Sequence, residues 1–325
     1  MRARFPVTPQ RFLTISYVAL AALTVIVLTG AAVRLTDSGL GCPDWPRCYG
    51  RAVPPLSFHS VVEYGNRVFS ATIGFVAIGA FVAALLRAPR RRDLIWISAL
   101  LPLGCLAQAI LGGFTVRHHL APGFVMAHFG LSMLILIAAV ALVFRARYEP
   151  GERPSSRDRV TVWLVRFLAV LGGVTIFVGT VATAAGPHAG GEDGVLIHRL
   201  HFRGAETLVW VIHRHAMFAT VLGLGVILAW FLARRRDGSP QLVESLTVAG
   251  VLMAAQGLVG SVQYGLELPA DLVWVHVTLA TVTWIALLWC VGAAGRIRRE
   301  ARPPAGAPRE RVAADPVGLE LPARR

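Results

Sequence analysis

The chain alternates between long apolar runs and shorter polar connections. An α-helix needs roughly 20 mostly apolar residues to cross a bilayer. Eight runs are long enough, at residues 12–33, 66–87, 94–116, 122–145, 161–183, 207–233, 242–264 and 270–293. The first run lacks a small-residue cleavage site of the usual kind, so we expect a retained helix rather than a signal peptide. The pattern predicts an all-α polytopic membrane protein.

Composition and charge support this class and suggest an orientation. Hydrophobic residues make up 55% of the 325 residues, and the mean hydropathy of +0.61 excludes a soluble enzyme. All 32 basic residues are arginine, and the net charge is +14. The arginines fall between the apolar runs rather than on one folded polar face, so we predict no nucleic-acid partner.

The distribution of arginine predicts which side of the membrane each connection faces. Before the C-terminal tail, 15 arginines fall in connections on one side and six in connections on the other. By the positive-inside rule, both termini are expected in the cytoplasm and the protein in the plasma membrane. The tail, 301–325, is rich in Pro, Ala and Arg, and is predicted to be disordered.

An internal repeat divides the apolar runs into two sets of four. Its anchors are spaced by 42 and then 20 residues in one set, and by 43 and then 20 in the other: Asn66, Gln108 and His128, then His213, Gln256 and His276. Each half, 1–150 and 151–300, contains an even number of spans. The repeat therefore predicts two parallel four-helix bundles related by a pseudo-two-fold axis along the membrane normal.

The anchors form a polar layer near the outer surface, and the layer of the second half suggests a heme. His213 and His276 lie on two helices of one bundle and are natural axial ligands for iron. Arg214 is a candidate partner for a heme propionate. His215 is a rival ligand, but it lies about 200° round the helix from His213. A histidine hydrogen-bonded between helices is the alternative to a ligand.

The first half offers a different set of groups at the same level. Asn66 and His128 provide one good iron ligand and one weak or open position. Glu63 lies three residues before Asn66, on the same helix face. A carboxylate beside an open iron position indicates chemistry, whereas the alternative is a surface Glu63 that pairs with Arg67.

The connections predicted to lie outside contain further reactive side chains. Cys42 and Cys48 are six residues apart and are candidates for a disulfide, either structural or redox-active. Zinc is disfavoured because four nearby ligands are not evident, and Cys105 and Cys290 are expected to be buried thiols. Three histidines of the second long outer connection are interpreted as solvated or heme-edge residues: His188, His198 and His201.

Together these motifs resemble the heme A synthase family, and the likeness runs over all eight spans. The segments that carry it are Gly30–Leu40, Cys42–Cys48, Glu63–Arg67, Gln108–Gly113, His128, Gly186–His188, His213–Arg214 and Trp274–His276. The family pattern has a histidine at the position of Asn66.

The resemblance implies oxidation of the C8 methyl group of heme O to the formyl group of heme A, for cytochrome oxidase assembly. It implies a resident heme b on His213 and His276. In the first half it implies a substrate heme site with His128 as ligand, Asn66 and Arg67 nearby, and Glu63 in a catalytic role. Heme O synthase and cytochrome oxidase assembly factors are the implied protein partners, and a homo-oligomer is left open.

Two other classes of function compete with this interpretation. A diheme electron carrier of the cytochrome b type would need four strong axial ligands, and Asn66 argues against it. A transporter built on parallel repeats would place its polar site at the midplane of the membrane. The predicted layer instead lies near the outer surface.

Overall fold

The structure is a computed structural model that describes residues 6–192, 195–236 and 238–298. The tail predicted at 301–325 lies outside the described residues. The helices are α1 (Pro9–Leu35), α2 (Phe58–Leu86), α3 (Arg92–Arg117), α4 (Pro122–Arg147), α5 (Arg159–Ala185), η1 (Gly204–Glu206), α6 (Thr207–Arg235), α7 (Pro240–Gly265) and α8 (Ala270–Ala294). Two short strands, β1 (Ser155–Ser156) and β2 (Arg296–Ile297), pair in parallel.

In the described part of the chain, eight helices are long and apolar enough to cross a membrane, which confirms the predicted class. Their ends agree with the predicted spans to within a few residues, except that α2 begins at Phe58 instead of residue 66. Ser57 caps this helix, because its hydroxyl accepts a hydrogen bond from the backbone N–H of Ser60 at 3.3 Å. The earlier start places Glu63 and Asn66 inside the helix.

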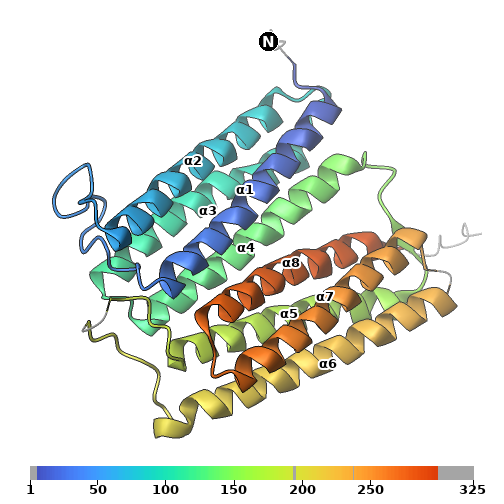
Figure 1. The fold of residues 1–325 in the computed structure, drawn as a ribbon. Coiled ribbons are helices and arrows are strands. Elements are labelled where there is room, and N and C mark those ends of the chain that lie inside the picture. Colours follow the sequence, from blue (N-terminus) through green and yellow to red (C-terminus); the bar gives the residue numbers. More distant parts are fainter. Residues whose placement is uncertain (1–5, 193–194, 237, 299–325) are drawn as a thin grey trace, which may run out of the picture.

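The helices form two four-helix bundles that lie side by side, α1–α4 and α5–α8 (Figure 1). In the first bundle α1 and α3 each pack against both α2 and α4, so α2 and α4 stand on a diagonal. In the second bundle α5 and α7 pack in the same way against α6 and α8. The helices predicted to carry paired ligands are therefore the diagonal helices of each bundle.

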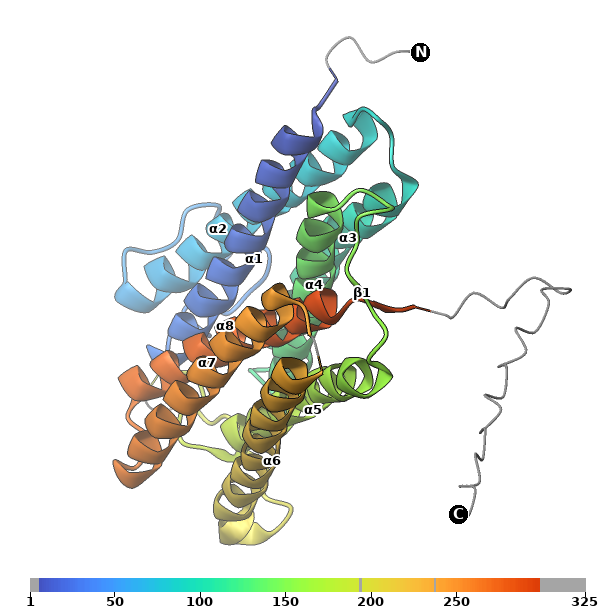
Figure 2. The same ribbon diagram turned by 90° about the vertical axis from the view of Figure 1, so that its right-hand side faces the viewer.

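The two bundles meet through α1, α4, α5 and α8, with α4 and α8 at the centre (Figure 2). The contacts α1–α8 and α4–α5 are exchanged by the repeat, and α4–α8 maps onto itself. This pattern is the one that a two-fold relation between the halves produces. Two tryptophans of α8 bridge the halves: the indole N–H of Trp274 donates to the Leu28 carbonyl at 3.0 Å, and that of Trp284 to the Met133 carbonyl at 3.1 Å.

Of the two bridging tryptophans, we expect Trp284 to contribute more to stability, because it is only 5% exposed. Trp284→Ala removes a large buried side chain and leaves the Met133 carbonyl without this donor, so we expect a loss of about 3–5 kcal/mol. Unfolding of the purified protein in detergent would measure this loss. Trp96, which is 74% exposed, is the matched control. Equal effects of the two alanine variants would contradict a bridging role for Trp284.

Candidate functional site

The loop between α1 and α2 packs onto the start of α2, at what we call the disulfide end of the molecule. Cys42 and Cys48 are bonded, as one of the sequence interpretations expected, and both are fully buried. The carboxylate of Asp44 accepts hydrogen bonds from the backbone N–H groups of Tyr49 and Gly50, each at 2.7 Å. These bonds, chiefly that from Gly50, hold the pKa of Asp44 below its usual value. The loop is therefore a compact, cross-linked unit.

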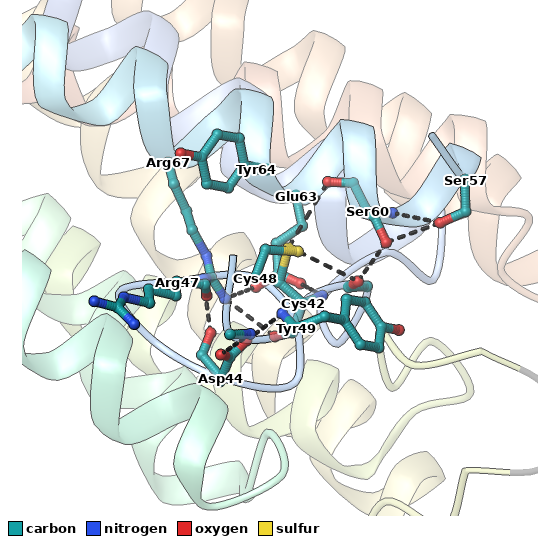
Figure 3. Close-up of a disulfide and its surroundings, with 12 residues drawn as sticks. Cys42, Asp44, Arg47, Cys48, Tyr49, Ser57, Ser60, Glu63, Tyr64 and Arg67 are labelled. Atoms are coloured by element: carbon teal, nitrogen blue, oxygen red, sulfur yellow. Dashed lines mark hydrogen bonds and ion pairs between the residues drawn. A yellow bond between two sulfur atoms is a disulfide. The ribbon is translucent and has the colours of Figure 1, made fainter. Parts of the chain in front are cut away.

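Glu63 and Arg67 fix this loop to α2 (Figure 3). One carboxylate oxygen of Glu63 accepts from the backbone N–H of Cys42 at 2.7 Å, and the other pairs with Arg67 at 2.5 Å. The Arg67 guanidinium also donates to the carbonyls of Cys42, Asp44 and Arg47 at 2.8–3.1 Å. The predicted alternative of a Glu63–Arg67 pair is thus present. Glu63 is only 5% exposed, however, so it is a buried carboxylate and not a surface residue.

Removing the disulfide should weaken the attachment of the loop to α2. Cys42→Ser with Cys48→Ser deletes a cross-link over a short loop, for which we expect a stability loss of about 2–4 kcal/mol. The backbone of the loop should also become more mobile, measured by faster amide hydrogen exchange at residues 42–48. Cys105→Ser changes a half-buried free thiol and serves as the control. Unchanged exchange in the double variant would show that the hydrogen bonds of Glu63 and Arg67 are sufficient to hold the loop.

His128 on α4 faces the backbone of α3. The side-chain amide of Gln108 donates to the backbone carbonyl of His128 at 2.9 Å and to the hydroxyl of Ser132 at 2.7 Å. One turn further along α3, a Cβ atom at Gly112 would lie 3.3 Å from Cε1 of the His128 ring. The His128 ring therefore packs closely on the backbone of α3 at Gly112, and a Cβ atom there would make a tight contact with the ring.

The same arrangement recurs around His276 on α8. Gln256 of α7 donates to the backbone carbonyl of His276 at 3.1 Å. A Cβ atom at Gly260, four residues after Gln256, would lie 3.0 Å from Cε1 of the His276 ring. Two of the three predicted anchors of the repeat are thus brought together in each half.

The third anchor differs from the sequence interpretation: His215, and not His213, lies beside His276. The ring centroids of His215 and His276 are 6.1 Å apart. The Nδ1–H of His215 donates to the Thr175 carbonyl of α5 at 3.0 Å, which leaves Nε2 as the free ring nitrogen. A Cβ atom at Gly179 would lie 2.9 Å from the His215 ring, so the helix faces fit closely here.

His213 points the other way. It lies on an exposed stripe of α6 and has its ring 6.4 Å from that of Tyr264 on α7. The described contacts therefore place His215, and not His213, beside His276, and the ligand role of either histidine stays a prediction. The reason is the helical rotation of about 200° between the two histidines, which allows only one of them to face α8.

Burial in the later turns of α2 and α6 supports a register of the repeat that differs by two residues from the one that the sequence suggests. α2 and α6 both contain 29 residues. In the later turns, four buried positions of each helix correspond at an interval of 149: Ile73, Ala77, Ala80 and Ala84 pair with Leu222, Val226, Ala229 and Ala233. The buried residues of the first turns, Ser60 and Glu63 in α2 and Thr207 and Val211 in α6, do not correspond at this interval. The same interval takes Asn66 to His215. Sequence similarity alone pairs Asn66 with His213, since it relies on the arginine that comes after each.

Contacts with the neighbouring helix agree with this register. Asn66 accepts a hydrogen bond from the Thr29 hydroxyl of α1 at 2.8 Å. α1 and α5 both contain 27 residues and begin at Pro9 and Arg159, so Thr29 corresponds to Gly179, the residue that approaches His215. Asn66 and His215 thus occupy equivalent places in the two bundles.

The spacing of His215 and His276 in the second half agrees with that of two histidines that bind one heme iron. Metal–imidazole bonds are about 2.0–2.1 Å long, so two imidazoles on opposite sides of one ion have centroids roughly 6 Å apart. The 6.1 Å between His215 and His276 meets this requirement. A ligating histidine usually donates its other N–H to a carbonyl or carboxylate, as His215 does to Thr175.

The remaining predicted residues lie elsewhere at the disulfide end. Arg214 stacks on the Trp210 ring, with its guanidinium carbon 5.2 Å from the ring centroid. The Nε2–H of His188 donates to the Leu268 carbonyl at 2.7 Å, while His198 and His201 are exposed. Over the described ranges, no three His, Cys, Asp or Glu side chains gather to form a metal cluster. Cys290 is a buried free thiol, as expected, and Cys105 is half-buried.

The fold and the site define a class: a membrane-spanning protein of two four-helix repeats, with a histidine held at equivalent places on α4 and α8. Comparison with known proteins specifies the class further. A family model described as "Cytochrome oxidase assembly protein" matches residues 13–288. The chain therefore belongs to this family, which is the heme A synthase family.

Named relatives agree with the family match. The chain is 24% identical over 259 residues to a protein named heme A synthase from Bacillus cereus (strain AH187), covering 77% of this chain and 83% of that one. It is 25% identical over 242 residues to the heme A synthase of Alkalihalophilus pseudofirmus, covering 70% of this chain and 78% of that one.

Proposed function

We propose that the chain is a heme A synthase, which oxidises the C8 methyl group of heme O to the formyl group of heme A. The observation that carries the proposal is the difference between two equivalent places. The second half has His215 opposite His276, whereas the first has Asn66 in the place of His215 and the buried carboxylate of Glu63 nearby. One half is suited to holding a heme permanently, and the other to binding a heme that enters and leaves.

We propose that His276 and His215 hold a resident heme b in the second half. When bound, this group supplies one-electron transfer chemistry, which the oxidation of a methyl group requires and side chains cannot provide. The diagonal helices α6 and α8 place the ligands within the bundle, and Thr175 fixes the tautomer of His215. Arg214 remains a proposed propionate partner, because it lies one residue from His215 near the disulfide end.

The first half is the proposed site of the substrate, heme O. His128 is its proposed iron ligand, held by Gln108 and Gly112. Asn66, whose side-chain oxygen is engaged by Thr29, is a weak ligand and leaves the opposite side of the iron open or easily exchanged. Weak ligation suits a substrate that must be released as product.

Glu63 is the proposed catalytic residue. It lies three residues before Asn66 and so on the same face of α2. Its carboxylate already accepts from Cys42 and Arg67, so it is oriented before any substrate arrives. We propose that it accepts and holds a proton released at the reacting methyl group. Arg67, which the sequence placed in the substrate heme site, serves chiefly to hold Glu63 and the loop.

Location and partners belong to the same proposal. The arginine distribution supports cytoplasmic termini in the plasma membrane, which puts the disulfide end and both heme sites toward the outer face. Heme O synthase as the source of substrate, and cytochrome oxidase assembly factors as receivers of product, are proposed partners.

Extraction of pigment from the purified full-length protein tests the function. Heme b together with heme O or heme A is the expected result, and conversion of added heme O should be detectable by chromatography. Two heme b molecules per chain and no conversion would favour the diheme electron carrier. A protein without any heme would overturn both functions.

A further inference from the structure

Two glutamines hold equivalent positions beside the two histidines of the repeat. Gln108 and Gln256 lie 20 residues before His128 and His276, on α3 and α7. Each donates its side-chain amide to the backbone carbonyl of its histidine, at 2.9 Å and 3.1 Å. This contact ties the helix that carries the histidine to its neighbour.

Each pair also leaves the same two polar atoms without a partner. The side-chain oxygens of Gln108 and Gln256 and the Nδ1 atoms of His128 and His276 are buried, and none has a hydrogen-bond partner among the described residues. A buried polar atom without a partner costs about 1–3 kcal/mol. An amide oxygen accepts and a protonated Nδ1 donates, so the two leftover atoms in each half are complementary.

Both atoms of each half belong to side chains at the contact between the helix that carries the glutamine and the helix that carries the histidine. The glutamine amide already reaches the backbone carbonyl of its own histidine. On the same helix, one turn further on, the Cβ position of Gly112 lies 3.8 Å from Nδ1 of His128, and that of Gly260 lies 3.4 Å from Nδ1 of His276. The edge of each ring that contains Cε1 and Nδ1 therefore faces the helix that carries the glutamine, and Nε2 lies more than 4 Å from that Cβ position.

We propose that Gln108 and Gln256 are positioning residues, whose side-chain oxygens accept a hydrogen bond from Nδ1–H of His128 and His276 when Nε2 binds iron. This inference rests on the proposed function, because it needs iron ligation by these histidines. Partners of the second ring nitrogen fix the orientation of a ligating histidine and raise its basicity. A neutral amide does so without placing a charge inside the membrane.

The reduction potential of the resident heme tests the proposal, measured by spectroscopic redox titration of the purified protein. Gln256→Leu removes the acceptor and makes His276 a less basic ligand, which disfavours the ferric state. We expect the potential to rise by an amount equal to about a tenfold change in the reduction equilibrium, or about 59 mV for one electron. Gln256→Glu accepts more strongly and should lower the potential.

Two variants serve as controls. Gln263→Leu changes a second glutamine of α7, which also has a buried side-chain oxygen without a partner among the described residues but lies three residues beyond Gly260. Gln108→Leu changes the equivalent glutamine in the other half. Neither should shift the potential of the resident heme. A shift in either control equal to that of Gln256→Leu would point to a general loosening of the helices and would overturn the proposal.

The outcomes separate this inference from the proposed function. A parent protein without heme b would overturn the proposed function and this inference with it. A parent that holds heme b, with the same potential in Gln256→Leu and Gln256→Glu, would overturn only the inference. If Gln256→Leu does not fold, Gln256→Glu is compared with Gln263→Glu, which adds the same charge to α7. A potential lowered more by Gln256→Glu supports the hydrogen bond to Nδ1, and one that is unchanged, raised or lowered equally in both excludes it.

Discussion

His215→Ala is expected to abolish binding of the resident heme, whereas His213→Ala is expected to keep it. The reason is the direction of each ring: His215 lies 6.1 Å from His276 and His213 faces Tyr264 on the other side of α6. The heme b content per purified chain, measured as the pyridine adduct, should fall to near zero in His215→Ala and His276→Ala.

The two histidines are two residues apart on the same helix, so each variant controls for the other. Loss of heme from His213→Ala with retention by His215→Ala would show that α6 turns when heme binds, and would restore His213 as the ligand. Unfolding in detergent should accompany both measurements, because a misfolded variant also loses heme. If the heme-free forms of His213→Ala and His215→Ala unfold with the same free energy, the difference in their heme content is due to iron ligation.

Glu63→Gln is expected to slow the conversion of heme O to heme A by about 10²–10⁴-fold, the usual contribution of a positioned proton acceptor. The amide oxygen of glutamine still accepts from the Cys42 N–H, so the loop should stay in place, but the side chain no longer takes up a proton. Conversion is measured in the purified protein supplied with heme O. The heme b content should match that of the parent.

The control for this prediction is Glu244→Gln, which changes an exposed glutamate near the start of α7. Hydrogen exchange at residues 42–48 distinguishes a chemical role from a supporting one. Slow conversion together with rapid exchange would mean that Glu63 acts by holding the loop. Conversion at the parent rate would remove Glu63 from the reaction.

The two competing functions require other residues or another position for the polar site than the structure has. A diheme carrier needs a second strong ligand opposite His128, yet the equivalent of His215 in the first half is Asn66, engaged by Thr29. A transporter needs its polar site near the midplane, whereas Glu63, Asn66 and His215 all lie in the first turns of helices that begin at the disulfide end. Both observations favour chemistry on a bound heme.

Much of the fold could be predicted because it depends on local properties of the chain. A run of about 20 apolar residues forms a helix wherever it lies in a membrane, since every backbone group must be satisfied within it. The number of spans could be predicted on this basis. The repeat could be predicted from the equal spacing of its glutamine and histidine anchors. The early start of α2 could not, because its first turns contain Ser60, Glu63 and Asn66 and lack the apolar pattern of a span.

Which histidine of α6 faces α8 could not be predicted, for a physical reason. Lipid tails are as apolar as a protein core, so the outward face of a membrane helix is as hydrophobic as the inward one. On α6 the exposed residues include Leu224, Ile227 and Phe231, and the buried ones include Leu222 and Val226. Apolar residues on both faces give no rotational signal, and the neighbouring arginine favoured His213.

The sequence by itself determined the membrane class and the two four-helix repeats, because hydropathy and the spacing of the anchors along the chain are sufficient for these. Its motifs also carried the resemblance to the family. Only the tertiary structure decided that His215 faces His276, that the disulfide loop encloses Glu63, and that Arg67 holds this loop. The first depends on how α6 turns about its axis when it packs, and a helix that is apolar on both faces gives no sign of that rotation in its sequence. The other two depend on how the loop between α1 and α2 folds onto α2, which spacing along the chain does not fix.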